Sequence, residues 1–338
     1  MMNRIRLGLT GFGEIPRHLF RMCTEDDRIE VVVISDLGKP DILSYLVSAE
    51  TKGRVKAKLD GNFLVANNQK SRFIGWGDPG KIPWDMFDVD IVVDGTWKFR
   101  SKADMEKHLE AGANRVFITS LPSDYIDRVV IRGVNEHTIK SADRLVSAGS
   151  ATTNAAALML KILWENFGID YSMITTVHSY TADQPLRDRA GNDYRKSRSA
   201  AENIIPVETV VPQWIEHIMP ELKGKIEGTA MNVPIPNGSL LDLTAGMKKK
   251  ITIEELNKVM TKAAKELSGI IQLVEDPIVS AYVIDNPHSL IFDKKATMIS
   301  SGRMLKVLIW YHSAFAMAAR LKELILAYDK ADKKGGSK

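Results

Sequence analysis

Short apolar runs alternate with amphipathic stretches over the first 150 residues of the chain. The apolar runs have the length and composition of buried strands: "RIRLGLTGF", "IEVVVISD", "VDIVVDGT", "RVFITS" and "RLVSAGS". The stretches between them have helical periodicity: "IPRHLFRMCTEDD", "DILSYLVSAE" and "KADMEKHLEAGA". Strands that alternate with helices at this spacing form parallel βαβ units with crossover helices. The pattern therefore predicts an α/β fold with a doubly wound sheet in this part of the chain.

The pattern changes after Ala151. A helix, "TNAAALMLKILWENFG", is predicted to end at Gly168, because glycine readily takes the left-handed conformation of a helix terminus. The strands predicted after it are "YSMITTVHSYT", "GTAMNVPIPN", "SLLDLTAGMK", "VSAYVI" and "MLKVLIWYH". One helix lies among them, and its Thr252 and Glu255 have the spacing of a capping box. This order indicates an α+β domain with a mixed or antiparallel sheet and helices on one side, followed by an amphipathic helix, "AFAMAARLKELILAY".

Composition and charge narrow the class of protein only a little. The chain has 338 residues and a formal charge of +4, an excess too small to indicate binding to nucleic acid or to an anionic membrane. Its single cysteine, Cys23, excludes an internal disulfide and a cysteine-rich zinc site, so we expect no metal and a reducing compartment. No apolar run reaches the ~18 residues of a membrane span, and the N-terminal region lacks a signal-peptide pattern. We therefore expect a cytoplasmic protein.

The first chemical signal is "GLTGFGEIPRHLF", at the end of the first predicted strand. Gly11 and Gly13 would let backbone N–H groups and the N-terminus of the next helix approach a pyrophosphate. Asp36, about 20 residues further on, is where a carboxylate would bind the adenine ribose. Pro16 occupies the position of the third glycine of this fingerprint. The segment predicts a Rossmann dinucleotide-binding domain; the alternative is a strand, turn and helix that bind no ligand.

Longer motifs follow one another in the order and spacing of one family. They include "GFGEIPR", "DPGKIPW", "DGTWKF", "SATTN", "TTVHSYTADQ", "PELKGKIEGTAMNVPIPN" and "VLIWYHSAF". Over residues 4–328 the chain resembles the phosphorylating glyceraldehyde-3-phosphate dehydrogenases. The resemblance implies an NAD-binding Rossmann domain at 1–150 that is completed by a C-terminal helix at 314–330, a catalytic or substrate domain at 151–313, and a homotetramer. In that family a cysteine thiolate attacks the aldehyde, a histidine activates the thiol and assists hydride transfer to NAD, and phosphate releases the acyl group.

The resemblance also implies roles for individual residues. On the substrate side these are His178 as the base, with Ser150, Thr152, Thr181 and Thr209 as polar groups around substrate or phosphate. For NAD they are Gly11, Gly13, Ile15, Asp36, Thr96, Ser120 and Ser313. The position of the nucleophile is Ala151, whose side chain has no lone pair with which to attack a carbonyl. We therefore expect no covalent aldehyde oxidation by this chain.

Other positions depart from the family pattern as well. Asn232 replaces the arginine that grips the substrate phosphate, and Val210 replaces a glycine beside it. Glu14 replaces an arginine of the dinucleotide loop, and Ser313 replaces the asparagine that orients the nicotinamide. These changes lie in separate sites, whereas a variant made to trap an intermediate would differ at one residue. They favour Ala151 as the native residue and weakened or altered NAD binding, and Asn232 and Val210 weaken the case for a triose phosphate. The further ligand that we expect is a small phosphorylated metabolite or nucleotide.

Three hypotheses remain open at this point. The first is a family member that has lost covalent chemistry and persists as an NAD-binding protein with a binding, regulatory or scaffold role. The second is an NAD(P)-dependent oxidoreductase of changed substrate, in which His178 is the general base for direct hydride transfer. The third is an active glyceraldehyde-3-phosphate dehydrogenase captured as a Cys-to-Ala variant.

Overall fold

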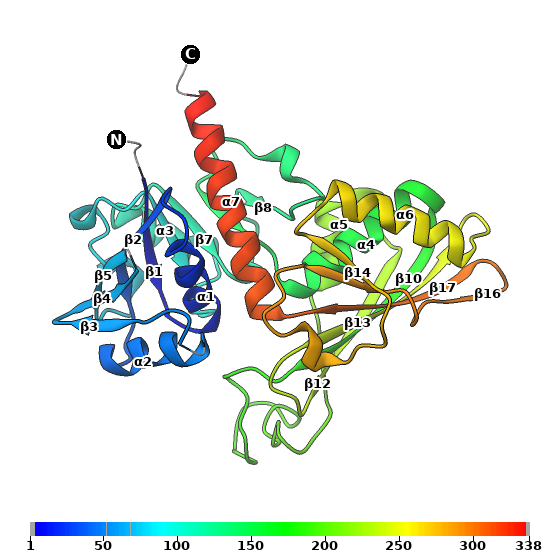
Figure 1. Cartoon of the computed structure of the whole chain (residues 1–338), viewed down its shortest axis with the longest axis horizontal. Helices are drawn as coiled ribbons and strands as arrows, with labels where there is room; N and C mark the ends of the chain where they lie inside the picture. Colours follow the sequence, from blue (N-terminus) through cyan, green and yellow to red (C-terminus); the bar gives the residue numbers. More distant parts are fainter. Residues whose placement is uncertain (1–3, 52, 68, 336–338) are drawn as a thin grey trace. The chain divides into compact units, whose positions relative to one another are not determined.

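The structure is a computed structural model that describes residues 4–51, 53–67 and 69–335. The chain divides into two compact units, whose elements are labelled in Figure 1. Unit 1 consists of Met1–Val130, Asn135–Ser150 and Met317–Lys338, and unit 2 consists of Ile131–Val134 and Ala151–Ala316. Helix α7 (Ser313–Gly335) begins in unit 2 and continues into unit 1.

Unit 1 is a doubly wound α/β fold. Within the described ranges its sheet has nine strands in the order β3-β4-β5-β2-β1-β6-β7-β9-β8. The strands are β1 (Ile5–Thr10), β2 (Ile29–Ser35), β3 (Lys58–Asp60), β4 (Phe63–Ala66), β5 (Gln69–Ile74), β6 (Ile91–Asp94), β7 (Arg115–Ile118), β8 (Arg128–Val129) and β9 (Leu145–Ser147). The helices are α1 (Glu14–Cys23), α2 (Pro40–Glu50) and α3 (Lys102–Glu110), with 3₁₀ helices η1 (Pro79–Lys81), η2 (Asp85–Phe87) and η3 (Glu136–Thr138). Parallel pairing of β1 with both β2 and β6, and of β7 with β6 and β9, confirms the predicted sheet.

The central strands of unit 1 are apolar because both of their faces are covered. β6 and β7 are buried along their whole length, as expected for parallel strands between two layers of helices. One core cluster is centred on Trp84, which is fully buried against Val33, Val89 and Val92. Cys23, at the end of α1, is also fully buried, and burial raises the pKa of its thiol to about 12.

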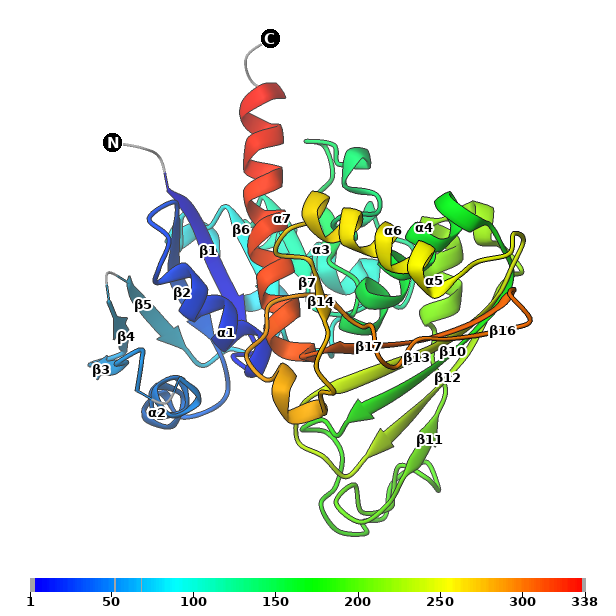
Figure 2. The same ribbon diagram turned by 45° about the vertical axis from the view of Figure 1, so that its right-hand side comes forward.

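Unit 2 is built on a mixed sheet. Its described strands run in the order β11-β12-β10-β13-β17-β15-β14, with β16 beside β17. They are β10 (Ile169–Ser179), β11 (Ile205–Val207), β12 (Ile226–Val233), β13 (Ser239–Met247), β14 (Ile271–Val274), β15 (Leu290–Asp293), β16 (Met298–Ser300) and β17 (Met304–Tyr311). Figure 2 shows α4 (Ala151–Phe167), α5 (Val211–Ile218) and α6 (Ile253–Glu266) gathered on one side of this sheet. The short helices are η4 (Pro220–Leu222) and η5 (Ser280–Val283). β10 pairs in parallel with β12 and antiparallel with β13, which confirms the predicted mixed α+β sheet.

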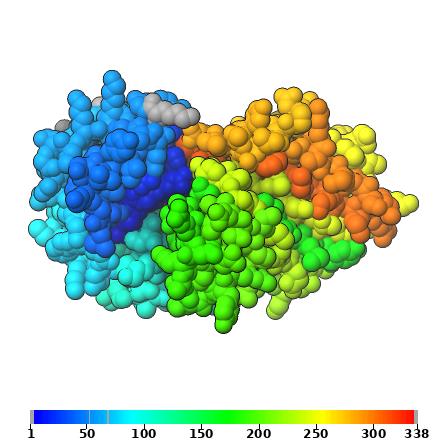
Figure 3. Space-filling model, turned by 90° about the horizontal axis from the view of Figure 1, so that it is seen from below, coloured from blue at the N-terminus to red at the C-terminus, as the bar shows by residue number. Residues whose placement is uncertain are grey.

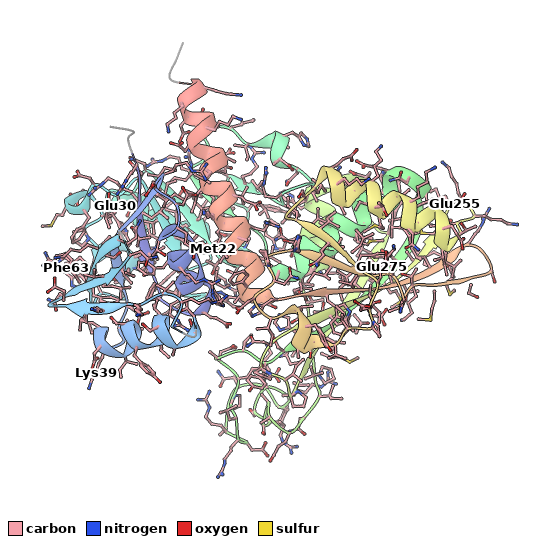
Figure 4. The ribbon with its side chains drawn as sticks, in the orientation of Figure 1. Met22, Glu30, Lys39, Phe63, Glu255 and Glu275 are labelled. Carbon is pink, nitrogen blue, oxygen red and sulfur yellow. The ribbon has the colours of Figure 1, made fainter. Side chains whose placement is uncertain are left out.

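Local signals in the sequence account for the end of α4 and the start of α6. Gly168 ends α4 with φ +70°, and its N–H donates to the carbonyls of Leu163 and Trp164, as predicted. The predicted capping box is also confirmed: Thr252 accepts the Glu255 N–H at 3.2 Å, and the Glu255 carboxylate accepts the Thr252 N–H at 2.9 Å. Glu255 stands where α6 begins (Figure 4). In the described part of the chain, no helix is both long and apolar enough to cross a bilayer.

One predicted strand of unit 2 is wrong. The segment "VSAYVI" contains the 3₁₀ helix η5 (Ser280–Val283) and no strand. Val283 is 1% exposed, whereas Val279 and Tyr282 are 56% and 71% exposed. A single buried residue anchors one helical turn but does not give the alternating row of side chains that a half-buried strand needs.

Candidate functional site

The turn between β1 and α1 contains two glycines that are needed for different reasons. Gly11 has φ +70°, and a Cβ built on it would lie 2.7 Å from the backbone nitrogen of Thr96. Gly11 is therefore required by the close approach of the loops that follow β1 and β6. Gly13 is the N-cap of α1, and no described heavy atom beyond its chain neighbours lies within 4 Å of a Cβ built on it. This open space beside a helix N-terminus is a cradle in which backbone N–H groups can reach an anion.

Asp36 follows β2 and is held by two backbone amides. The Phe12 N–H donates to Oδ2 at 2.6 Å, and the Gly38 N–H donates to Oδ1 at 2.7 Å. The contact with Phe12 ties the carboxylate to the glycine turn after β1. A carboxylate has about four acceptor sites, so the partly exposed Asp36 keeps lone pairs for ribose hydroxyls. The structure thus brings the predicted ribose-binding and pyrophosphate-binding groups together in unit 1.

Pro16 packs directly against the loop that follows β6. A Cβ built on Gly95 would lie 2.3 Å from Pro16 Cγ, so the proline ring fills the space that a side chain at position 95 would need. A proline is tolerated here because the first turn of a helix has no internal acceptor for its N–H. In the usual fingerprint the helix carries the small residue at this contact. Here the glycine lies on the loop.

Glu14 is the first residue of α1, and its side chain is 45% exposed. Its Oε1 atom lies 3.8 Å from Nε2 of His18, one helical turn later. An acidic side chain at this position interacts favourably with the helix dipole. The same end of α1 is where a pyrophosphate would bind, so Glu14 opposes that ligand with a like charge.

A buried chain of hydrogen bonds supports the loop that follows β6. The Trp84 indole N–H donates to His108 Nδ1 at 3.0 Å, which leaves the ring proton on Nε2, 3.2 Å from Asp94 Oδ2. The other oxygen of Asp94 accepts the N–H and the hydroxyl of Thr96 at 2.7 and 2.6 Å. Trp84, His108 and Asp94 are each at most 2% exposed. Thr96, a predicted cofactor residue, is therefore positioned from inside the protein.

Ile15 and Ser120 are the remaining predicted cofactor residues of unit 1. Ile15 is buried in the first turn of α1. Ser120 follows β7, is 5% exposed, and accepts the hydroxyl of Ser147 through its carbonyl at 2.7 Å. All the predicted cofactor residues of unit 1 thus lie just beyond the carboxyl ends of parallel strands, where doubly wound sheets bind ligands.

In unit 2, Ala151 is the first residue of α4 and is 8% exposed. Ser150 directly precedes it. The hydroxyl of Thr152 bonds to the Tyr311 hydroxyl at 2.8 Å, and Thr152 is 6% exposed. Burial raises the pKa of Tyr311 well above its usual range, so this pair is a neutral hydrogen bond. Thr152, which was predicted to contact the substrate, has its hydroxyl engaged in the core.

His178 is held in one tautomer near the end of β10. Its Nδ1 atom lies 2.6 Å from the carbonyl oxygen of Ser179, and because a carbonyl only accepts, Nδ1 carries the proton. The lone pair is therefore on Nε2. Burial lowers the pKa of His178 below its ordinary value of 6.5, although the hydrogen bond to Ser179 acts in the opposite direction. The imidazole is consequently neutral at pH 7 and can accept a proton at Nε2.

Ser313 and Asn232 lie beside His178. Ser313 Oγ is 3.5 Å from His178 Nε2 and 3.2 Å from Ser239 Oγ. Asn232 on β12 is the register partner of His178 on β10, so the two residues are neighbours on the same face of the sheet. Ser313, predicted to bind NAD, thus comes within reach of the predicted base, which its place in the sequence did not indicate.

The hydroxyls predicted to hold phosphate already have partners. Thr181 donates to the Asp183 carboxylate at 2.5 Å, and Thr209 accepts the Val211 N–H at 3.3 Å. Thr181 belongs to the segment between β10 and β11, which is exposed on the face drawn in Figure 3, where it is green. The negative charge of Asp183 beside Thr181 disfavours an anion at that hydroxyl.

Both halves of the chain match models of known protein domains. Residues 5–102 match the model described as "Glyceraldehyde 3-phosphate dehydrogenase, NAD binding domain", and residues 150–313 match "Glyceraldehyde 3-phosphate dehydrogenase, C-terminal domain". The chain belongs to the glyceraldehyde-3-phosphate dehydrogenase family. A glyceraldehyde-3-phosphate dehydrogenase of Priestia megaterium is 40% identical over 325 residues, which cover 95% of this chain and 97% of that protein. Glyceraldehyde-3-phosphate dehydrogenase 1 of Bacillus subtilis has the same identity and coverage, and the enzyme of Geobacillus stearothermophilus is 39% identical.

Membership of the glyceraldehyde-3-phosphate dehydrogenase family confirms NAD as the implied cofactor, and the residues of unit 1 fit it. Gly13 leaves the helix N-terminus open, and Asp36 is fixed beside the same turn with lone pairs to spare. These two features would hold the pyrophosphate and the adenine ribose of the dinucleotide. Glu14, at the first position of α1, opposes an anionic ligand at this turn.

Proposed function

We propose that this chain is a glyceraldehyde-3-phosphate dehydrogenase-like protein that binds NAD but does not oxidise an aldehyde through a covalent intermediate. In this proposal unit 1 is the cofactor domain and unit 2 is the substrate domain. The observation that carries the proposal is the pairing at the predicted catalytic positions: His178 is a neutral base with its lone pair on Nε2, but Ala151 at the start of α4 supplies no nucleophile. A base without a thiol cannot form the thiohemiacetal on which the covalent route depends.

A second function is favoured by the same imidazole. His178 Nε2 is suited to take the hydroxyl proton of an alcohol or of a hydrated aldehyde. NAD, when bound, would accept the hydride from the carbon that carries this hydroxyl. No bond to the protein forms in that reaction, so an alanine at position 151 does not prevent it. Ser313, 3.5 Å from Nε2, would help to orient the ring and the substrate hydroxyl.

We propose that NAD is preferred to NADP. The Asp36 carboxylate, fixed by the Phe12 and Gly38 amides, would repel a 2′-phosphate on the adenine ribose. We also propose that affinity for NAD is lower than a turn without Glu14 would give. The helix N-terminus contributes roughly 0.3–1 kcal/mol to a nearby anion, and Glu14 already uses that interaction.

The further ligand that we propose is a small phosphorylated metabolite or nucleotide, bound more weakly than in a site with an arginine. Asn232 beside His178 can donate a hydrogen bond to a phosphate but carries no charge. The Asp183 carboxylate, which accepts the Thr181 hydroxyl, also disfavours the binding of an anion there. A thermal-shift series with sugar phosphates and nucleotides tests this proposed ligand. If none of them raises the melting temperature at a concentration a hundredfold above a millimolar Kd, the proposed ligand class is wrong.

The remaining family features are proposals of the same kind. We propose a homotetramer, because the face of the unit 2 sheet opposite the helices exposes large apolar side chains. On β10, Tyr171 and Met173 are 56% and 64% exposed, whereas Ile174 on the other face is 1% exposed. Light scattering on the purified chain measures this directly, and a monomer at micromolar concentration would contradict it. A cytoplasmic location is proposed because the free thiol of Cys23 suits a reducing compartment.

Binding and turnover measured on the same preparation test the proposed function. We expect calorimetry to detect NAD binding that is tighter than NADP binding, and no phosphate-dependent NAD reduction with glyceraldehyde 3-phosphate. The Bacillus subtilis relative serves as a positive control for the assay. Sustained turnover by the unmodified chain would refute the loss of covalent chemistry, and failure to bind either dinucleotide would refute the cofactor assignment.

Restoring the thiol separates the loss of one residue from a wider divergence. We expect Ala151→Cys to recover little or no glyceraldehyde 3-phosphate oxidation, because Asn232 and Ser313 also differ at the positions that hold substrate and nicotinamide. Ala151→Ser is the matched control, since it adds an atom of similar size without a thiolate. Turnover by Ala151→Cys close to that of the Bacillus subtilis relative would mean that position 151 alone separates this chain from the active enzymes.

A further inference from the structure

Trp97 has a backbone conformation that bulky residues avoid. Its φ is +60°, in the left-handed region that glycine, asparagine and aspartate can occupy but that is rare for other side chains. Half of the residue is exposed, although an indole of this size is usually covered. A strained backbone that presents an aromatic ring to solvent is a reason to look for a function, because such strain collects at ligand sites.

The indole is fixed in place. Its Nε1–H donates to the Thr119 hydroxyl at 3.1 Å, which joins the loop after β6 to the end of β7. The residue before it, Thr96, is anchored twice to Asp94, and the Lys98 N–H donates to the Thr96 hydroxyl at 3.2 Å. Behind Asp94 stand the buried His108 and Trp84. The loop therefore holds the Trp97 indole in one orientation, so little conformational entropy of this side chain would be lost when a ligand binds to it.

The place of Trp97, in the loop that follows β6, indicates which part of a bound ligand its indole ring would contact. β1 lies between β2 and β6, and the chain order reverses there, so the carboxyl ends of β1 and β6 border the crevice in which doubly wound sheets bind dinucleotides. Asp36, after β2, marks the adenosine side of this crevice. Trp97 stands on the other side and reaches from β6 to β7, where the second nucleotide of the dinucleotide would lie.

We propose that the Trp97 indole forms an aromatic wall for the nicotinamide half of NAD and contributes to its affinity. The inference rests on the proposed NAD binding and assigns to this site a contact that the glycine fingerprint does not include. The flat indole offers a π face to the nicotinamide ring or its ribose, and aromatic stacking of this kind changes affinity by about tenfold.

Calorimetric titration of NAD and ADP into Trp97 variants tests the wall. Trp97→Gly and Trp97→Asn both tolerate a positive φ, so both should fold while lacking the ring. We expect each to weaken NAD binding about tenfold and to leave ADP binding unchanged, since ADP lacks the nicotinamide half. Trp97→Phe should lie between them and the unmodified chain. Trp164→Phe, at the far end of α4 from Ala151, is the matched control and should leave both affinities unchanged.

Each outcome bears on a different claim. Equal NAD affinity in Trp97→Gly, or tighter binding, would overturn the wall, because the indole would then be neutral or an obstruction. An equal loss for NAD and ADP would also overturn it, since Trp97 would then only support the loop. If the unmodified chain binds ADP but not NAD, the wall is wrong; if it binds neither, the proposed cofactor function fails and the wall fails with it.

Discussion

In unit 1 the predicted cofactor residues are held by backbone amides and buried side chains, whereas in unit 2 the predicted catalytic residues are separate side chains that act through single atoms. Asp36 is fixed by two amides, and Thr96 is fixed by Asp94 and His108 behind it. In unit 2 the predicted base His178 is well oriented, but Ala151, at the predicted position of the nucleophile, has only a methyl group.

The difference shows which parts of a site tolerate divergence. In the cofactor site of unit 1, the free energy that holds the site in place is spread over many backbone contacts. The site therefore persists when one residue such as Glu14 changes. A covalent mechanism depends on one sulfur atom, and its loss abolishes the route without disturbing the fold around it. Experiments that remove one contact from the cofactor site of unit 1 therefore measure how far this comparison holds.

The largest effect on stability is expected from removing His108, because the buried hydrogen bonds of Trp84 and Asp94 in unit 1 depend on it. His108→Leu leaves the Trp84 N–H and one oxygen of Asp94 without their partner, which should lower the free energy of unfolding by about 3 kcal/mol. Urea unfolding measures this. The same change at the exposed His137 is the control and should cost at most about 0.5 kcal/mol. A loss below about 1 kcal/mol for His108→Leu would mean that the stability of unit 1 does not depend on this network.

A smaller effect is expected where α1 meets the loop after β6. Gly95→Ala places a Cβ 2.3 Å from Pro16 Cγ and 2.9 Å from the Gly11 carbonyl, so it should destabilise the chain by about 2 kcal/mol. Pro16→Gly in the same chain should restore part of that loss, because it removes the first clash and leaves the second. The two single variants and the double variant form a cycle that isolates the contact. Additive changes would show that the two residues do not interact.

The charge at the N-terminus of α1 should matter less. Glu14→Gln removes the like charge beside the proposed pyrophosphate site, so NAD should bind about threefold more tightly at low salt, with a smaller gain at high salt. Glu110→Gln is the control. Glu110 is the last residue of α3, which also belongs to unit 1, and its replacement should not change the affinity for NAD. Unchanged or weaker NAD binding by Glu14→Gln would show that the turn is already adapted to its present ligand.

The weakest effect is expected in the pH dependence of stability. Because burial lowers the pKa of His178 below 6.5, the unfolded chain binds a proton in a range where the folded chain does not. Its contribution to stability is therefore complete above pH 6.5 and is lost as the pH falls toward the folded pKa. Urea midpoints from pH 7.5 to 5 should fall less steeply for His178→Asn than for the unmodified chain. Parallel slopes would show that the imidazole is not buried in its neutral form.

Patterns that span many residues were predictable from the sequence, and contacts between distant residues were not. The βαβ alternation, the mixed sheet and the end of α4 at Gly168 follow from periodicity and local conformational preference. The segment at η5 was wrongly predicted as a strand because it is rich in apolar residues. Their presence in the sequence does not show that Val283 is the only buried residue of the segment.

The candidate site divides in the same way. The glycine turn and Asp36 have a fixed spacing along the chain, which is why the sequence predicted them. The packing of Pro16 on Gly95, the approach of Ser313 to His178 and the positive φ of Trp97 arise from residues brought together by folding. A proline in place of the third glycine was a signal that some other residue near it had to be small.

The buried thiol of Cys23 makes this chain a convenient background for site-specific chemistry. It is the only sulfhydryl in the sequence, it is inaccessible, and its pKa of about 12 leaves almost no thiolate at neutral pH. A maleimide or iodoacetamide reagent should therefore leave the folded chain unmodified. A cysteine introduced at an exposed position, such as Tyr194 in the segment between β10 and β11, would take up a single fluorophore or spin label without removal of the native residue.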